Sequence, residues 1–143
     1  MSATADAAEQ QRQPASRLGI QPGQVVQEVG FDEDCDAALR ASIQEVSGNT
    51  FVDEGYDDVV DMVLLWWRDG DGDLVDALVD SLTALDAGGV IWLLTPKAGR
   101  RGHVEPSDIE EAAPTSGLSA TRSTAAAPEW SGTRLVAPKM GRR

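Results

Sequence analysis

One stretch of the sequence, residues 56–97, constrains the fold of this chain more than any other. An apolar run at 62–67 is followed by an acidic, glycine-containing turn at 68–73, an amphipathic segment to Leu85 and a second apolar run at 90–94. Short segments that are apolar on both faces are typical of strands in a parallel sheet that helices cover on both sides. The stretch therefore predicts a strand–helix–strand unit, with strands at 61–67 and 90–94 and a helix at 73–85.

The sequence before this unit predicts one more strand and one more helix. Residues 24–29 have the apolar pattern of a strand, and 50–52 are a short strand candidate. Between them, acidic residues open a helix with Asp32 as its N-cap, and Gly48 provides its C-terminal stop. Strand and helix thus alternate, which indicates an α/β fold.

The sequence after the unit predicts a short helix and a closing hairpin. Ser107–Glu110 has the pattern of a capping box, and Pro114 is expected to end that helix. Residues 118–126 and 133–136 are expected to form an antiparallel hairpin. The predicted architecture is a minimal Rossmann-like, mostly parallel sheet with flanking helices and a C-terminal antiparallel hairpin.

Length and composition limit the organisation of the chain. A chain of 143 residues has room for one domain, which we place at 17–139, after a disordered segment at 1–16 and before a basic tail at 140–143. The single cysteine, Cys35, is expected to be buried and fits a reducing compartment. Because there is no signal-peptide pattern and no apolar run near ~20 residues, we expect a cytoplasmic protein that does not enter membranes.

The charge is strongly negative and unevenly distributed. The formal net charge is -12, and residues 28–80 contain sixteen acidic residues against two basic ones, Arg40 and Arg68. Nucleic-acid binding depends on cations that neutralise phosphates, so with this charge balance we do not expect the protein to bind nucleic acid. An acidic surface of this kind favours a basic protein partner.

The acidic turn after the first apolar run invites a calcium interpretation. Asp69, Asp71 and Asp73 have the spacing of the first ligands of an EF-hand loop, but the sixth position, which needs glycine, is Leu74. Glycines followed by a capping Asp are also what a strand-to-helix turn requires. The pattern favours a turn capped by Asp73, with weak divalent-cation binding as the alternative, and we expect no resident metal or cofactor.

Polar and aromatic side chains gather where two parallel strands end, which is where open α/β sheets bind ligands. We predict that a ligand or partner site is formed there by residues from the two following loops: Trp67, Arg68, Asp69, Asp71, Asp73, Thr95, Lys97 and His103. The basic residues of the second loop are expected to pair with the aspartates of the first. His103 is the only histidine, and no nucleophile elbow accompanies it, so we assign no catalytic residue.

Four segments together resemble a known family. The segments 17–26, 58–68, 90–97 and 130–136 look like those of domain-of-unknown-function family 3052, small and mostly actinobacterial proteins. The resemblance covers roughly residues 16–139. No activity comes with it, so it implies a class of protein without implying a function.

A looser similarity concerns Rossmann-like methyltransferases. Tyr56-Asp57-Asp58 before a strand, and a Leu-x-x-Gly-Gly turn at 85–89 before the next, are similar to the C-terminal half of that class. Where those enzymes have a glycine-rich cofactor loop, this chain has only Gly30, followed by Phe31 and three acids that we expect to crowd the cofactor.

Two functions follow from these observations. The first is a non-enzymatic regulatory or protein-interaction module, whose acidic face and loops at 69–73 and 95–103 contact a basic partner. The alternative is a degenerate methyltransferase-like protein that binds S-adenosylmethionine or a nucleotide, with Asp53 or Glu54 near the ribose and Trp67 stacked on the base. The absence of an assembled catalytic set favours the first.

Overall fold

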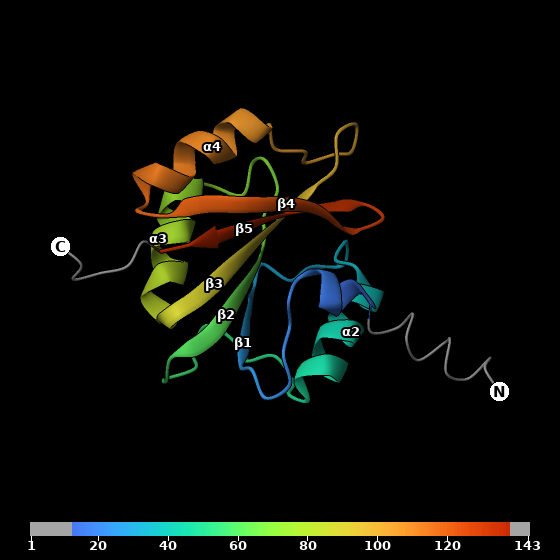
Figure 1. Cartoon of the computed structure of the whole chain (residues 1–143). Helices are drawn as coiled ribbons and strands as arrows, with labels where there is room; N and C mark the ends of the chain where they lie inside the picture. Colours follow the sequence, from blue (N-terminus) through green and yellow to red (C-terminus); the bar gives the residue numbers. More distant parts are fainter. Residues whose placement is uncertain (1–12, 138–143) are drawn as a thin grey trace.

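The computed structural model describes residues 13–137 and shows, over that range, a mixed sheet of five strands between two layers of helices (Figure 1). The order across the sheet is β1 (Val26–Val29), β2 (Val60–Trp66), β3 (Leu85–Pro96), β5 (Trp130–Val136) and β4 (Ser119–Ala127). The first three strands are parallel, whereas β5 runs antiparallel to both β3 and β4. The predicted α/β fold with a C-terminal antiparallel hairpin is confirmed.

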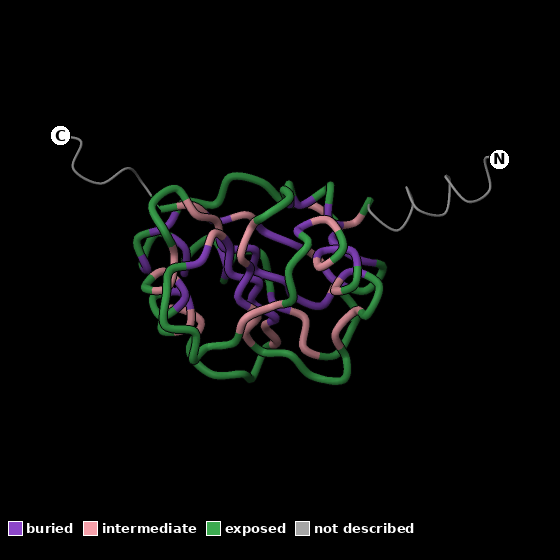
Figure 2. The backbone as a smooth tube through the Cα atoms, turned by 90° about the horizontal axis from the view of Figure 1, so that it is seen from below, coloured by how far each residue is buried: buried purple, intermediate pink, exposed green. Residues whose placement is uncertain are grey.

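Helices cover both faces of the sheet. Helix α2 (Ala37–Ser47) packs on one face, and helices α3 (Leu74–Ala84) and α4 (Pro106–Thr115) pack on the other (Figure 1). Two buried clusters result, one on each side, and the buried part of the backbone runs through the middle of the molecule (Figure 2). Among the described residues, no helix is long and apolar enough to cross a bilayer.

Strand β2 is apolar from Met62 to Trp66 because its two faces belong to different cores. Met62, Leu64 and Trp66 join the cluster beneath α2, whereas Val63 and Leu65 join the cluster beneath α3 and α4. Alternation along a strand enforces this division. The adjacent tryptophans therefore differ: Trp66 is fully buried, and Trp67 is half-buried on the side of α3.

The chain reverses its direction across the sheet between β1 and β2. Val52, in the predicted strand 50–52, forms a parallel bridge to Gln27 on the outer side of β1, and the chain then returns to form β2 on the inner side. In open α/β sheets, the carboxyl ends of the strands at such a switch point form a ligand-binding crevice. In this protein that point lies after Val29 and Trp66.

Several local predictions need correction. Helix α2 begins at Ala37, and its N-cap is Asp36, whose side chain accepts the Leu39 amide. Asp32 lies in a turn before the helix, where its backbone carbonyl accepts the Cys35 amide. Strand β3 begins at Leu85, so Gly88 and Gly89 lie within a strand and not in a turn.

The predicted capping box and the N-terminal boundary also differ from the structure. Glu105 precedes α4 without a side-chain cap, and Pro106 occupies the first turn. Residues 13–17 are helical and Ala15 is buried, so the ordered fold begins before the predicted boundary at residue 17. The remainder of the predicted disordered segment and the predicted basic tail lie outside the described residues.

The assignment of the α2 cap can be tested by two alanine substitutions. Asp36 accepts a hydrogen bond of 2.8 Å from the Leu39 amide, so Asp36→Ala should lower the free energy of unfolding by about 1 kcal/mol. Asp32→Ala should change it by less than about 0.5 kcal/mol, because Asp32 caps no helix. Urea unfolding of both variants measures the difference, and equal effects would contradict the assignment.

Candidate functional site

The carboxyl ends of the parallel strands bring three loops together: 30–36 after β1, 67–73 after β2 and 97–105 after β3. The Trp67 amide donates to the Leu94 carbonyl at 2.8 Å, which extends the pairing of β2 with β3. The Asp69 amide donates to the Gly102 carbonyl at 2.8 Å. The two loops predicted to form a site are thus neighbours. Their contact is made by backbone groups at this point.

Arg68 joins the loops at the switch point. Its Nε and Nη2 atoms donate to the Asp34 carboxylate at 3.0 and 2.6 Å, and Nη1 donates to the Gly30 carbonyl at 2.9 Å. The guanidinium carbon lies 5.3 Å from the centre of the Trp130 ring. With only 15% of its side chain exposed, Arg68 ties the loop after β1 to the end of β2.

Gly30 brings the same two segments into close contact. Its φ is +83°, and a Cβ atom there would lie 2.3 Å from the Trp66 carbonyl oxygen. The glycine thus serves contact between two protein segments. Phe31, which we expected to crowd the crevice, is 57% exposed and stacks under Arg40. Arg68, and not Phe31, contacts the Gly30 carbonyl.

The ion pair shifts the protonation of both partners. The hydrogen bonds from Arg68 hold the pKa of the Asp34 carboxyl below its usual range, despite some opposing desolvation, and Asp34 raises the pKa of Arg68. Burial raises the pKa of the Cys35 thiol, with a smaller contribution from Asp34 in the same direction.

The structure disperses most of the predicted site residues. Asp73 caps α3, Thr95 is buried within β3, and His103 Nδ1 lies 2.8 Å from the Pro96 carbonyl oxygen. The Lys97 amide donates to the Glu129 carbonyl, and Arg100 pairs with the Glu129 carboxylate at 2.6 Å, not with the acidic turn. Across residues 13–137, no group of three or more acidic, histidine or cysteine side chains could hold a metal ion.

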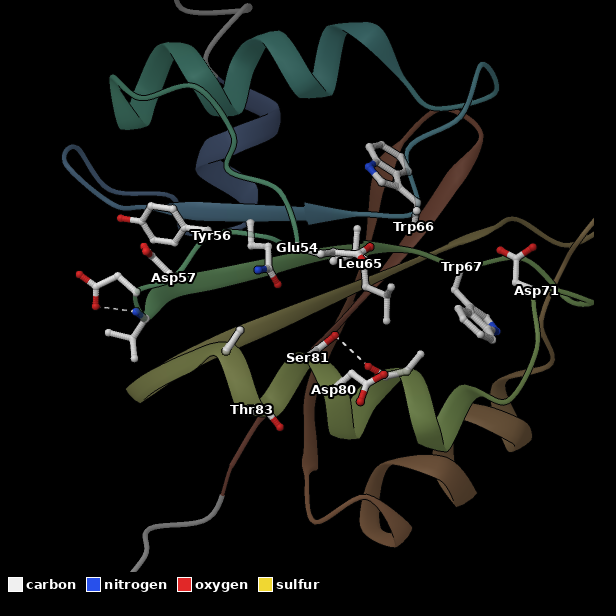
Figure 3. A pocket seen from close by; sticks show the side chains of 17 residues that line it. Glu54, Tyr56, Asp57, Leu65, Trp66, Trp67, Asp71, Asp80, Ser81 and Thr83 are labelled. Atoms are coloured by element: carbon white, nitrogen blue, oxygen red, sulfur yellow. Dashed lines mark hydrogen bonds between the residues drawn. The ribbon is translucent and has the colours of Figure 1, made fainter.

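A cavity of about 860 Å³ lies on the face of β1 and β2 opposite α2. Trp67 and Asp71 stand at one end and Tyr56 and Asp57 at the other, with α3 along one side (Figure 3). The Trp66 ring points away from it, towards α2 (Figure 3). Its apolar lining includes Val29, Leu65 and Ala77. We call this cavity the α3 groove.

The α3 groove is acidic. None of its lining residues is Lys, Arg or His. Five carboxylates line it: Glu54, Asp57, Asp58, Asp71 and Asp80. Gln27, only 5% exposed, also lines it, and its amide nitrogen donates to the Asp53 carbonyl. A concave, partly apolar surface with a few polar groups is typical of a binding site, and the charges here favour a cationic occupant.

Sequence reasoning found part of the α3 groove, including Glu54, which the adenosyl alternative named. Of the eight predicted site residues, Trp67 and Asp71 line it. The side formed by α3 was missed, although Ala77, Ser81 and Ala84 place small side chains at i, i+4 and i+7 of the helix. That spacing puts them on one face, and it was a readable signal for a hollow beside the helix.

Comparison with solved structures places this architecture in the class of Rossmann-like, methyltransferase-type folds. The glycopeptide N-methyltransferase MtfA matches with a TM-score of 0.60 at 13% identity, over 91% of this chain and 90% of that one. Magnesium protoporphyrin IX methyltransferase from Synechocystis PCC 6803 with bound SAM matches with a TM-score of 0.53 at 15% identity, over 96% and 79%. A SAM-dependent methyltransferase from Thiobacillus denitrificans in complex with S-adenosyl-L-homocysteine matches with a TM-score of 0.56 at 12% identity, over 91% of each chain. At these identities the likeness shows the fold alone.

Sequence comparison then identifies the family. The model of the protein family of unknown function DUF3052 matches residues 15–139, and the chain belongs to this family. Uncharacterised proteins of Mycobacterium bovis and Mycobacterium tuberculosis are 55% identical over 125 residues, which is 87% of this chain and 78% of each relative. The resemblance read from the four sequence segments is confirmed.

The Arg68–Asp34 pair should give the protein a defined pH dependence. The Asp34 pKa is lowered in the folded state. The stability that the ionised Asp34 contributes is therefore complete above its unfolded pKa of about 3.9, and it is lost as pH falls through the folded pKa. We expect Arg68→Gln to lower the free energy of unfolding by about 1–2 kcal/mol at pH 7, because the charged donor serves several acceptors. The loss should shrink towards pH 2.

Urea titrations between pH 2 and pH 7 measure this effect. Asp34→Asn provides the matched control, because it keeps the shape of the carboxyl and removes its titration. The difference between Asp34→Asn and the parent protein should also shrink at low pH. A difference that stays constant from pH 7 to pH 2 would contradict the role given to the ion pair.

Proposed function

We propose that this protein is a non-enzymatic interaction module that binds a basic protein partner through the α3 groove and the acidic face around it. The groove itself carries the proposal: it is concave and partly apolar, and it is lined by five carboxylates and by no basic side chain. Complementary charge steers such partners together and suppresses binding of acidic ones. The net charge of -12 adds to the attraction.

The state of the switch point supports binding over catalysis. Arg68 donates to the Asp34 carboxylate and to the Gly30 carbonyl beside the position where an α/β enzyme would hold its cofactor. His103 is held by the Pro96 carbonyl and lies 3.8 Å from Glu105, and it does not line the α3 groove. The groove and these hydrogen bonds are thus consistent with a fold used for recognition.

Charge reversal tests the proposal. The groove variant Glu54→Lys/Asp57→Lys/Asp80→Lys should lose a basic partner that the parent protein captures from lysate of its own organism. The control Asp108→Lys/Glu110→Lys/Glu111→Lys makes the same change of charge on the exposed side of α4 and should retain it. Added salt should weaken capture by the parent protein, because exposed charges are screened.

Circular dichroism first establishes that both triple variants fold. Capture that survives reversal in the groove, or that is lost equally in both variants, would contradict a role for the α3 groove.

An adenosyl ligand is a second candidate, favoured by the fold and by the groove. Two matching methyltransferases were solved with SAM or S-adenosyl-L-homocysteine bound, and 860 Å³ is within the range of small-molecule sites. Glu54 and Trp67 both line the groove, as a ribose-binding carboxylate and a stacking ring would. The opposing observation is the ion pair of Arg68 at the switch point.

Thermal denaturation separates this candidate from the first. A ligand at ~100 times its Kd adds ~2.7 kcal/mol to the stability, which for a domain of this size raises the midpoint by several degrees. The adenosyl candidate predicts such a shift with SAM and with S-adenosylhomocysteine. It predicts no shift with ATP, whose phosphates the five carboxylates repel. No shift with either adenosyl compound at millimolar concentration would exclude it.

A further inference from the structure

The α3 groove lies where the fold lacks a crossover helix. Val52 is paired parallel to β1, so the chain between Val52 and Val60 connects two parallel strands across one face of the sheet. Such crossovers ordinarily take a dozen or more residues and usually contain an α-helix. Here only residues 53–59 make the connection, and no helix is assigned among them. The face of β1 beside α3 therefore lacks the cover that a parallel sheet requires.

The edge of β1 does not offer an alternative way of binding. An extended peptide would need free backbone groups along this edge to add a strand. The Val52 amide already donates to the Val26 carbonyl at 3.0 Å, and the Glu28 amide donates to the Val52 carbonyl at 3.0 Å. These bonds occupy the middle of a four-residue strand. Occupation of the adjoining face is favoured over extension of the sheet.

We infer that the α3 groove receives an amphipathic helix of a partner protein, with lysine or arginine flanking its apolar stripe; this inference rests on the proposed function and specifies the partner. The apolar stripe packs against Val29 and the small residues of α3, Ala77 and Ala84, which are partly exposed and permit close approach of a helix. Its cations lie near Asp57 at one end of the groove and near Asp80 along α3 (Figure 3), because Asp71 at the other end is already paired with Arg68 at 3.4 Å.

A second copy of this chain does not fit the groove. Helix α3 carries Asp76 and Asp80 and no basic residue, and α4 carries three acids and no basic residue. Each would bring negative charge onto the five carboxylates. Helix α2 carries one basic residue, Arg40, which is already paired with Glu28 at 2.6 Å. These three helices thus disfavour a second copy as the occupant and favour a helix from a different, basic protein.

Two synthetic peptides test the inference. Both consist of leucine and lysine in equal numbers and are about 14 residues long, roughly 21 Å as a helix. One has its leucines at helical spacing, and the other alternates leucine and lysine as in a strand. Calorimetry on the full chain should show the helical peptide binding about tenfold or more tightly than the alternating one. Circular dichroism should show that it gains helicity on binding.

Two tryptophan substitutions separate shape from charge. Thr83 lines the groove, is exposed and donates its hydroxyl to the carbonyl four residues earlier in α3. Thr115 is exposed and makes the same bond in α4, away from the groove. Thr83→Trp should fill the groove and weaken the helical peptide about tenfold, whereas Thr115→Trp should leave its affinity unchanged. Neither variant alters the charge, and both positions tolerate a large side chain.

The outcomes distinguish the inference from the proposed function. If both peptides bind equally and both are lost in Glu54→Lys/Asp57→Lys/Asp80→Lys, the acidic groove attracts basic chains of any conformation. The helix inference then fails while the proposed function stands. If neither peptide binds at low salt, both fail. If the helical peptide binds equally to Thr83→Trp and Thr115→Trp, it binds elsewhere and the inference is overturned.

Discussion

The carboxyl edge of the sheet depends on the hydrogen bonds that the Arg68 guanidinium donates. They join Asp34 and Gly30 of the first loop to the end of β2, and the guanidinium lies near the Trp130 ring at the start of β5. A cation with only 15% of its side chain exposed is stable there because its donors meet a carboxylate and carbonyl oxygens. The α3 groove begins beside this cluster, at Val29, Gly30 and Trp67, and extends along the face of the sheet beside α3.

That space follows from the length of one connection. A short crossing from Val52 to Val60 reverses the direction of strand addition without placing a helix over β1. On the opposite face, α2 and the N-terminal turn complete the cover, and the Trp92 indole donates to the Leu18 carbonyl beneath them. The two faces thus differ in how completely they are covered, and the acids of 54–58 and α3 lie on the less complete one.

The sequence predicted what periodicity encodes and missed what depends on distant contacts. The doubly apolar run of β2 and the capped helix α3 were readable, because each pattern has one structural interpretation. The start of α2 was not: Asp32 and Asp36 are both acceptable caps, and only the turn formed by Cys35 on Asp32 selects between them. The Arg68–Asp34 pair joins residues 34 positions apart, and local sequence does not encode such a pairing. The α3 groove was hidden for the same reason, because its two sides come from 54–59 and α3 and meet only through the topology.

Concentrating carboxylates around the α3 groove has a consequence for the free protein as well as for the complex. Like charges on one surface destabilise the compact state, and a basic helix that binds only the folded chain relieves this repulsion while it stabilises the fold by mass action. The same charges repel acidic helices, including α3 and α4 of a second copy of the chain, and therefore disfavour self-association. In the proposed interaction the acids keep the groove free until a cationic partner occupies it, and this proposal would account for a partly apolar lining and an acidic surround in one site.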